Sequence, residues 1–230
     1  MRLCMVYSPD VPKIIGQYVT ASNALLTLDQ ATCRRGGRVL FQNLSLSLGE
    51  GDVIHLAGPN GAGKTSLLRV IAGALPFEGA LAWQGTPISE NTRASHAARF
   101  AYLPANDTHL KVLETSYENL MFWARLWGIG GDIAENSLSA LGLLDLRDRP
   151  VRFLSAGQKR RLSLAAVIMK GSWLWLLDEP LNGLDAESSL LFRAALDRHT
   201  AKGGLAVIAS HLNVEPPATG TLRRVTLGAA

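Results

Sequence analysis

The segment Gly58–Thr65 constrains the fold more than any other part of the chain, because it matches the pattern G-x-x-x-x-G-K-[ST] in full. Glycines in such a loop let backbone N–H groups converge on phosphate oxygens, and the start of a helix adds a favourable dipole. The loop therefore needs a strand before it and a helix after it. Val53–Ala57 is a short apolar run that predicts the strand, and Lys64–Gly73 has the apolar spacing of a helix.

Each part of this loop has a chemical task if its ligand is a nucleoside triphosphate. The amine of Lys64 reaches the outer phosphates, and the hydroxyl of Thr65 is a ligand for Mg²⁺. The alternative is an ordinary glycine-rich turn, which the flanking strand and helix disfavour. The residues that we expect to contact the nucleotide here are Gly58, Pro59, Asn60, Gly61, Ala62, Gly63, Lys64, Thr65 and Ser66.

Two further patterns of apolar residues predict the rest of the sheet structure. Apolar residues alternate with polar ones within 26–48, around a turn at 33–37, which predicts an antiparallel β edge. Farther along, the apolar runs Trp173–Leu177 and Leu205–Ala209 flank a helical stretch, Ala186–Leu196. A strand, a crossover helix and a second strand in this order are typical of a parallel sheet.

The domain organisation follows from the same periodicities. Helical spacing between the two groups of strands predicts a helical insert at about residues 105–160. Residues 25–230 then form one α/β domain with a mainly parallel core sheet, an antiparallel β edge and a helical subdomain. Residues 1–24 have no clear period, and we interpret them as an N-terminal extension of unknown role.

Composition and charge exclude several classes of protein. With 47% apolar and 18% charged residues the chain is not disordered, and a formal charge of +4 is too small to indicate a nucleic-acid partner. The longest apolar stretch, Leu162–Leu177, is interrupted by Lys170 and is too short for a membrane-spanning helix. Cys4 and Cys33 lack the spacing of metal ligands, and no signal-peptide pattern opens the chain. We therefore expect a cytoplasmic protein.

An acidic pair, Asp178 and Glu179, directly follows the apolar run that ends at Leu177. Ligands bind beyond the carboxyl ends of strands in parallel sheets. Asp178 is then placed to hold Mg²⁺, and Glu179 to orient or deprotonate an attacking water. The alternative is that both acids begin a solvated loop, which the phosphate-binding loop makes less favourable.

Two further segments are candidates for contacts with phosphate. Ser155 and the following backbone N–H groups precede an expected helix at 159–169 and could form a second phosphate-binding helix start, although a plain N-cap explains the same residues. His211 follows the run that ends at Ala209, where its imidazole could contact a terminal phosphate and sense its loss. An ordinary surface or packing role is the alternative for this histidine.

In their order along the chain, these segments resemble the nucleotide-binding domain of ABC transporters, from Leu25 onward. The resemblance is carried by the phosphate-binding loop, Leu154–Gln158, Leu176–Pro180, Leu181–Asp185 and Ser210–His211. It implies a P-loop NTPase fold of ABC type and an ATPase that uses ATP and Mg²⁺. It also implies a head-to-tail homodimer that forms on ATP, so that one chain alone is inactive or nearly so.

The same resemblance assigns roles to individual residues. It makes Glu179, His211 and Lys64 catalytic, and it makes Thr65 and Asp178 the ligands of the metal ion. ATP would lie between the phosphate-binding loop of one chain and the signature segment of the other. The residues implied to contact the nucleotide in this second way are Ser155, Ala156, Gly157, Gln158 and Asp185.

One subgroup of ABC proteins matches more closely than the rest. Ala156 stands where most members have glycine, and this variant, together with the stretch 149–162, looks like the ATP-binding subunits of the haem exporter type in cytochrome c biogenesis. The resemblance implies integral membrane subunits as partners at the cytoplasmic face of a bacterial inner membrane. Two alternatives stay open: the ATPase of another short ABC exporter, and a nucleotide-gated clamp with little hydrolysis.

Two positions depart from the family pattern. Most relatives have a glutamine after Tyr-Leu-Pro that touches Mg²⁺ and links to the membrane subunit, but this chain has Ala105 and Asn106 there. Asn106 could replace the glutamine only with a local shift. The aromatic residue that stacks on adenine in the family falls at Arg35. A guanidinium can stack on a base, and a solvated turn is the alternative.

Four tryptophans could either pack within the fold or form part of a binding site. Trp173 and Trp175 alternate with leucines, and we interpret them as strand packing rather than a cofactor site. Trp123 and Trp127 lie in the helical insert, where members of the family dock a helix of their membrane partner. Packing in the core is the alternative for this second pair.

Overall fold

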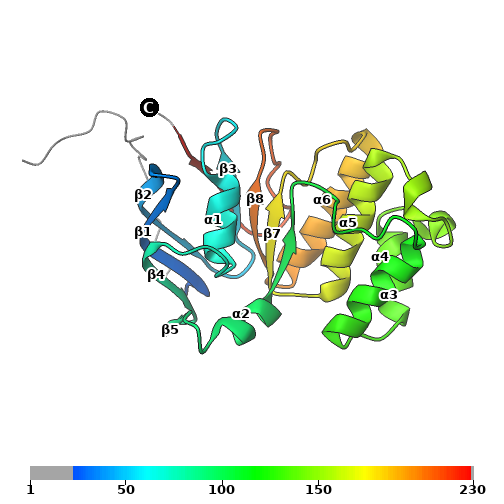
Figure 1. The fold of residues 1–230 in the computed structure, drawn as a ribbon, viewed down its shortest axis with the longest axis horizontal. Helices are drawn as coiled ribbons and strands as arrows, with labels where there is room; N and C mark the ends of the chain where they lie inside the picture. Colours follow the sequence, from blue (N-terminus) through cyan, green and yellow to red (C-terminus); the bar gives the residue numbers. More distant parts are fainter. Residues whose placement is uncertain (1–22, 229–230) are drawn as a thin grey trace, which may run out of the picture.

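Helix α1 (Lys64–Ile71) lies between two β-sheets, one antiparallel and one parallel (Figure 1). The computed structural model describes residues 23–228, so residues 1–22 of the expected extension, with Cys4, lie outside the described residues. The far face of the parallel sheet is covered by helices from the second half of the chain. The expected α/β architecture, with a parallel core sheet and an antiparallel β edge, is confirmed.

Within residues 23–228, the antiparallel sheet has four strands in the order β2-β1-β4-β5. They are β1 (Leu26–Arg35), β2 (Arg38–Leu48), β4 (Glu78–Trp83) and β5 (Thr86–Pro87). The expected turn at 33–37 is shorter in the structure, because only Gly36 and Gly37 separate β1 from β2 and both have positive φ. Arg35 therefore ends a strand instead of lying in a solvated turn.

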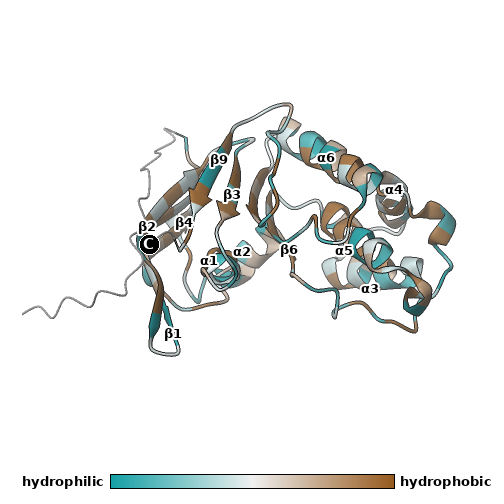
Figure 2. Cartoon of the chain, turned by 90° about the horizontal axis from the view of Figure 1, so that it is seen from above, coloured by the Kyte–Doolittle hydropathy of each residue, from teal (hydrophilic) through white to brown (hydrophobic). Residues whose placement is uncertain are grey.

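The parallel sheet of the same residues has five strands in the order β6-β7-β8-β3-β9. They are β6 (Phe100–Leu103), β7 (Leu174–Asp178), β8 (Leu205–Ala209), β3 (Val53–Ala57) and β9 (Leu222–Thr226). β3 and β8 follow the predicted bounds. β6 and β9 were not predicted from the sequence. β3 is buried along its whole length, whereas β9 lies at the sheet edge, is partly exposed and has a hydrophilic stretch (Figure 2).

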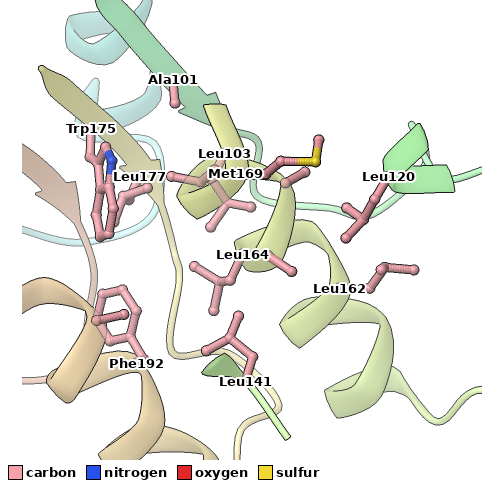
Figure 3. Packing of buried hydrophobic residues seen from close by; sticks show 14 of the residues in the cluster. Ala101, Leu103, Leu120, Leu141, Leu162, Leu164, Met169, Trp175, Leu177 and Phe192 are labelled. Carbon is pink, nitrogen blue, oxygen red and sulfur yellow. The ribbon is translucent and has the colours of Figure 1, made fainter. Parts of the chain in front are cut away.

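Side chains of the central strands alternate between two hydrophobic cores. On β7, Leu174 and Leu176 pack with α1 and the antiparallel sheet. Trp175 and Leu177 point to the opposite face, where they pack with residues of the helices, Phe192 among them (Figure 3). The parallel sheet is thus buried on both faces, and the carboxyl ends of its strands have fixed positions.

Five helices follow α1 in the described residues. They are α2 (Arg93–Arg99), α3 (Ser116–Trp127), α4 (Asp132–Ala140), α5 (Ala156–Lys170) and α6 (Ala186–Ala201), with 3-10 turns at Leu144–Leu146 and Val151–Phe153. α3, α4 and α5 pack against one another, and α5 also packs against β6. No helix within the described part of the chain combines the length and the apolar character needed to cross a bilayer.

Two local predictions are wrong in detail. The helix expected at 159–169 begins at Ala156, because a capping box between Ser155 and Gln158 satisfies its first N–H groups. Trp173 precedes β7 and is 51% exposed, so it does not pack in the sheet, whereas Trp175 is buried and stacks on His199 at 4.0 Å between ring centroids.

Candidate nucleotide site

The phosphate-binding loop joins β3 to α1 at the edge where the parallel strands end. Gly58 could not be replaced there, since a Cβ would lie 2.3 Å from the carbonyl oxygen of Leu227 and its φ is +136°. Lys64 is buried, and its Nζ donates hydrogen bonds to the carbonyl oxygens of Gly58 and Pro59, at 2.7 and 3.2 Å. The loop is therefore folded as a compact cradle with its lysine inside it.

A cavity of about 370 Å³ opens at this loop. Its lining brings together most of the residues that the sequence predicts for one nucleotide site, including the acidic pair from the end of β7 and Arg35 from the end of β1. The lining residues are Arg35, Leu40, Asn60, Gly61, Ala62, Gly63, Lys64, Thr65, Ser66, Ala105, Asp178 and Glu179.

Thr65 and Asp178 form a pair of oxygen ligands that fits Mg²⁺. The Thr65 hydroxyl donates a 2.7 Å hydrogen bond to Oδ2 of Asp178. Mg²⁺ is usually held by one or two protein oxygens together with phosphates and water, so this pair beside a phosphate cradle has the chemistry that the ion prefers. Burial raises the pKa of Asp178, and the charge of Glu179 raises it further, while the Thr65 hydrogen bond lowers it.

Glu179 and His211 are paired beside the cavity. His211 Nδ1 lies 2.9 Å from Oε2 of Glu179, and because a carboxylate can only accept, Nδ1 carries the proton. The Glu179 side chain is 12% exposed and that of His211 is 53% exposed. Glu179 has a φ of +50°, which costs a non-glycine residue about 1–3 kcal/mol, and its N–H donates to the Ala209 carbonyl at 2.7 Å. This hydrogen bond holds the backbone of Glu179 in its strained shape.

His55 is a neighbour of this site that the sequence analysis did not single out. It lies on β3, is buried, and its Nε2 donates to the carbonyl oxygen of Ser210 at 3.1 Å, directly before His211. Burial lowers the pKa of His55, although this hydrogen bond raises it. A histidine inside an otherwise apolar five-residue strand was the signal that could have identified it.

The signature segment lies apart from the cavity of its own chain. In the described residues, Ser155, Ala156, Gly157 and Gln158 are not among those that line the cavity. Ser155 and Ala156 are exposed at the start of α5, and the side chain of Gln158 accepts a hydrogen bond from the backbone N–H of Ser155. Their contact with a nucleotide of a second chain stays a prediction.

Two other predicted residues have structural tasks in this chain. Asp185 is the N-cap of α6 and accepts a 2.8 Å hydrogen bond from the N–H of Ser188, and its hydrogen bonds to Ser188 hold its pKa below the usual value. The side chain of Asn106 is exposed and accepts from the Thr108 hydroxyl at 2.9 Å, whereas Ala105 lines the cavity. Asn106 is not among the described residues that line the cavity.

The chain is similar in sequence to a known protein family and to individual proteins. The family model described as ABC transporter matches residues 41–182. The chain is 43% identical over 201 residues to the cytochrome c biogenesis ATP-binding export protein CcmA of Paramagnetospirillum magneticum, covering 85% of this chain and 92% of the relative. It is 44% identical to the protein of the same name from Novosphingobium aromaticivorans, covering 81% and 88%.

Solved structures agree on the fold. The ATP-binding subunit of an ABC transporter superposes with a TM-score of 0.75 at 21% identity, over 87% of this chain and 88% of the other. CbiO1 of Clostridium perfringens, part of the CbiONQ ABC transporter complex, gives 0.72 at 23% identity, over 83% and 79%. Sequence and fold lead to the same conclusion: the chain belongs to the ABC transporter family, as an ATP-binding subunit whose reaction is ATP hydrolysis.

Proposed function

We propose that this chain is the ATPase subunit of a bacterial inner-membrane complex that handles or exports haem during the biogenesis of c-type cytochromes. Support comes from relatives more than 40% identical that are named for cytochrome c biogenesis and export, and from Ala156 in the signature segment. The observation that carries the catalytic part is the Glu179–His211 pair beside a phosphate cradle.

Each residue of the cavity has a task in this proposal. The cradle and Lys64 bind the phosphates of ATP, and Arg35 stacks on the adenine. Bound Mg²⁺ on Thr65 and Asp178 would neutralise charge on the outer phosphates. Glu179 orients the attacking water and accepts its proton, while His211 keeps that carboxylate aimed and contacts the terminal phosphate. Because phosphoryl transfer depends on position and charge, the strained backbone at Glu179 serves the reaction directly.

A second copy of the chain completes the site in this proposal. The cavity is partly open to solvent, and an open site gives little protection of the reaction from bulk water. Ser155 is exposed and caps the start of α5, and a helix start favours negatively charged groups. A head-to-tail pair, formed on ATP, brings that helix start over the terminal phosphate of the partner.

The membrane subunits bind, in this proposal, on the helical part of the chain. Several large apolar side chains of α3 and the preceding loop are exposed, most of all Leu113 at 73%. A pocket of about 240 Å³ is lined in part by the stacked rings of Trp123 and Trp127, which also belong to α3. Apolar side chains gathered in this way indicate a protein interface, here with integral subunits at the cytoplasmic face of the membrane.

Deletion of the gene tests this function. A deletion strain should lose c-type cytochromes, measured by haem staining, and the wild-type gene should restore them while Lys64→Ala should not. The complex, purified with its membrane subunits, should hydrolyse ATP and show the absorption band of haem. Normal c-type cytochromes in the deletion strain would point to another short exporter, and a complex that binds ATP without turnover would point to the nucleotide-gated clamp.

A further inference from the structure

Arg160 is a buried cation that joins three separate segments. It lies in the first turns of α5 and is 2% exposed. Its Nη1 donates to the carbonyl oxygen of Pro104 at 2.7 Å and to Oδ1 of Asp107 at 3.2 Å. Its Nη2 donates to the carbonyl oxygens of Asp178 at 2.5 Å and Glu179 at 2.9 Å. All four terminal N–H groups of the guanidinium are thereby used.

The chemistry of this contact requires arginine. A guanidinium presents its donors in a planar, rigid fork, so one side chain can hold acceptors that lie on two sides of it. A lysine has three donors around one point and cannot span the same acceptors. Burial lowers the pKa of Arg160, and the charges of Asp107, Asp178 and Glu179 oppose that effect. A buried charge that makes this number of hydrogen bonds fixes the relative positions of the groups that it contacts.

The three joined segments each belong to the nucleotide cavity or to the helix that carries the signature segment. Pro104 directly precedes Ala105, which lines the nucleotide cavity. The carbonyl groups of Asp178 and Glu179 lie on either side of the strained Glu179 backbone. α5 carries Ser155 at its start, and Asp107 binds this helix a second time through the Ser163 hydroxyl, at 2.7 Å. One guanidinium thus links the cavity wall, the acid and the signature helix.

We propose that Arg160 is a positioning residue that couples the nucleotide cavity to the signature helix and holds the backbone of Glu179 in its strained shape. The proposal rests on the proposed role of Glu179. It predicts that Arg160 acts on the turnover step and leaves nucleotide binding to the cradle, which it does not touch.

The test compares two adjacent arginines of α5 in the complex purified with its membrane subunits. Arg160→Met should lower kcat roughly tenfold to a hundredfold, the range expected when a catalytic group is displaced by about 1 Å, with ATP affinity within about twofold of wild type. Arg161→Met is the matched control, because within residues 23–228 the hydrogen bonds of the Arg161 guanidinium go to the carbonyls of Leu141 and Gly142. It should lower the melting temperature and keep kcat within about twofold.

Two further variants keep the proposal falsifiable. Arg160→Lys retains the charge and should not restore kcat; full restoration would overturn the requirement for the fork. If Arg160→Met does not fold, Asp107→Ala tests the same coupling. Asp107→Ala should lower kcat several-fold with unchanged ATP affinity. Equal losses in Arg160→Met and Arg161→Met, or a loss confined to ATP affinity, would overturn the proposal. Wild-type turnover in the same preparation tests the proposed ATPase function separately.

Discussion

Arg35 ends β1 and lines the same cavity as the phosphate cradle, while its neighbour Arg34 pairs with Glu78 at 3.4 Å. If Arg35 stacks on adenine, Arg35→Ala should weaken ATP binding by about 1 kcal/mol, or roughly fivefold, and leave binding of tripolyphosphate nearly unchanged. Titration calorimetry with both ligands measures this. Arg34→Ala is the matched control and should change neither affinity. An equal loss for both ligands in Arg35→Ala would indicate a simple charge effect.

His199 makes stability depend on pH. Its pKa is lowered to about 4, chiefly by burial, while the hydrogen bond to the Leu205 carbonyl raises it and the charge of Lys202 lowers it. As the pH falls from about 6.5 to about 4, the unfolded chain takes up a proton that the folded chain excludes, so the free energy of unfolding falls. The loss for this group is at most about 3 kcal/mol.

Chemical denaturation at pH 7 and pH 5 tests whether the free energy of unfolding falls as the pH is lowered. The wild type should be less stable at pH 5, and His199→Gln should show a smaller difference between the two conditions. His55, His96 and His109 also have lowered pKa values through burial, so part of the difference should persist in the variant. The same difference in variant and wild type would contradict the account of His199.

At the scale of elements, the start of α5 depends on close packing against the loop before α6. A Cβ on Gly157 would lie 2.6 Å from the carbonyl oxygen of Gly183. Gly157→Ala should therefore displace either the helix start or the loop and lower kcat by about tenfold or more. Gly171→Ala at the other end of the same helix meets nothing within 4 Å but has a φ of +61°, so it should cost about 1 kcal/mol of stability with normal turnover. Loss of turnover in both variants would show that general destabilisation is responsible.

The elements around the phosphate-binding loop were predictable, because the motif itself demands β3 and α1 and fixes where they meet. β6 and β9 were not. β6 has only four residues, and β9 contains Arg223 and Arg224 and lies at the sheet edge. Neither gives the long apolar pattern from which a strand is recognised.

Some residues of the site could likewise be predicted from the sequence, and others could not. Asp178 and Glu179 could be predicted, since an acidic pair at the end of an apolar run has meaning beside a phosphate cradle. Arg160 could not, because three consecutive cations at 159–161 are typical of a solvated helix face. Only the approach of β6 and β7 to α5 supplies the carbonyl groups that bury this guanidinium.

At the scale of the whole molecule, the nucleotide cavity and Ser155 lie on separate parts of the surface. If a partner chain brings Ser155 to the nucleotide, Ser155→Arg should leave ATP binding to the monomer unchanged and prevent the ATP-dependent dimer. Light scattering with size-exclusion chromatography, with and without ATP, measures both states. A variant that dimerises on ATP like the wild type would contradict the head-to-tail arrangement.

The most direct test of the whole account is Glu179→Gln in the complex purified with its membrane subunits. The cradle and Lys64 are untouched, so ATP should bind with wild-type affinity. Loss of the base should lower kcat by about a hundredfold or more, and the ATP-bound dimer should accumulate. Lys64→Ala, in contrast, should lose both binding and turnover. Hydrolysis by Glu179→Gln at the wild-type rate would contradict the claim that this carboxylate activates the cleavage of ATP held by the cradle.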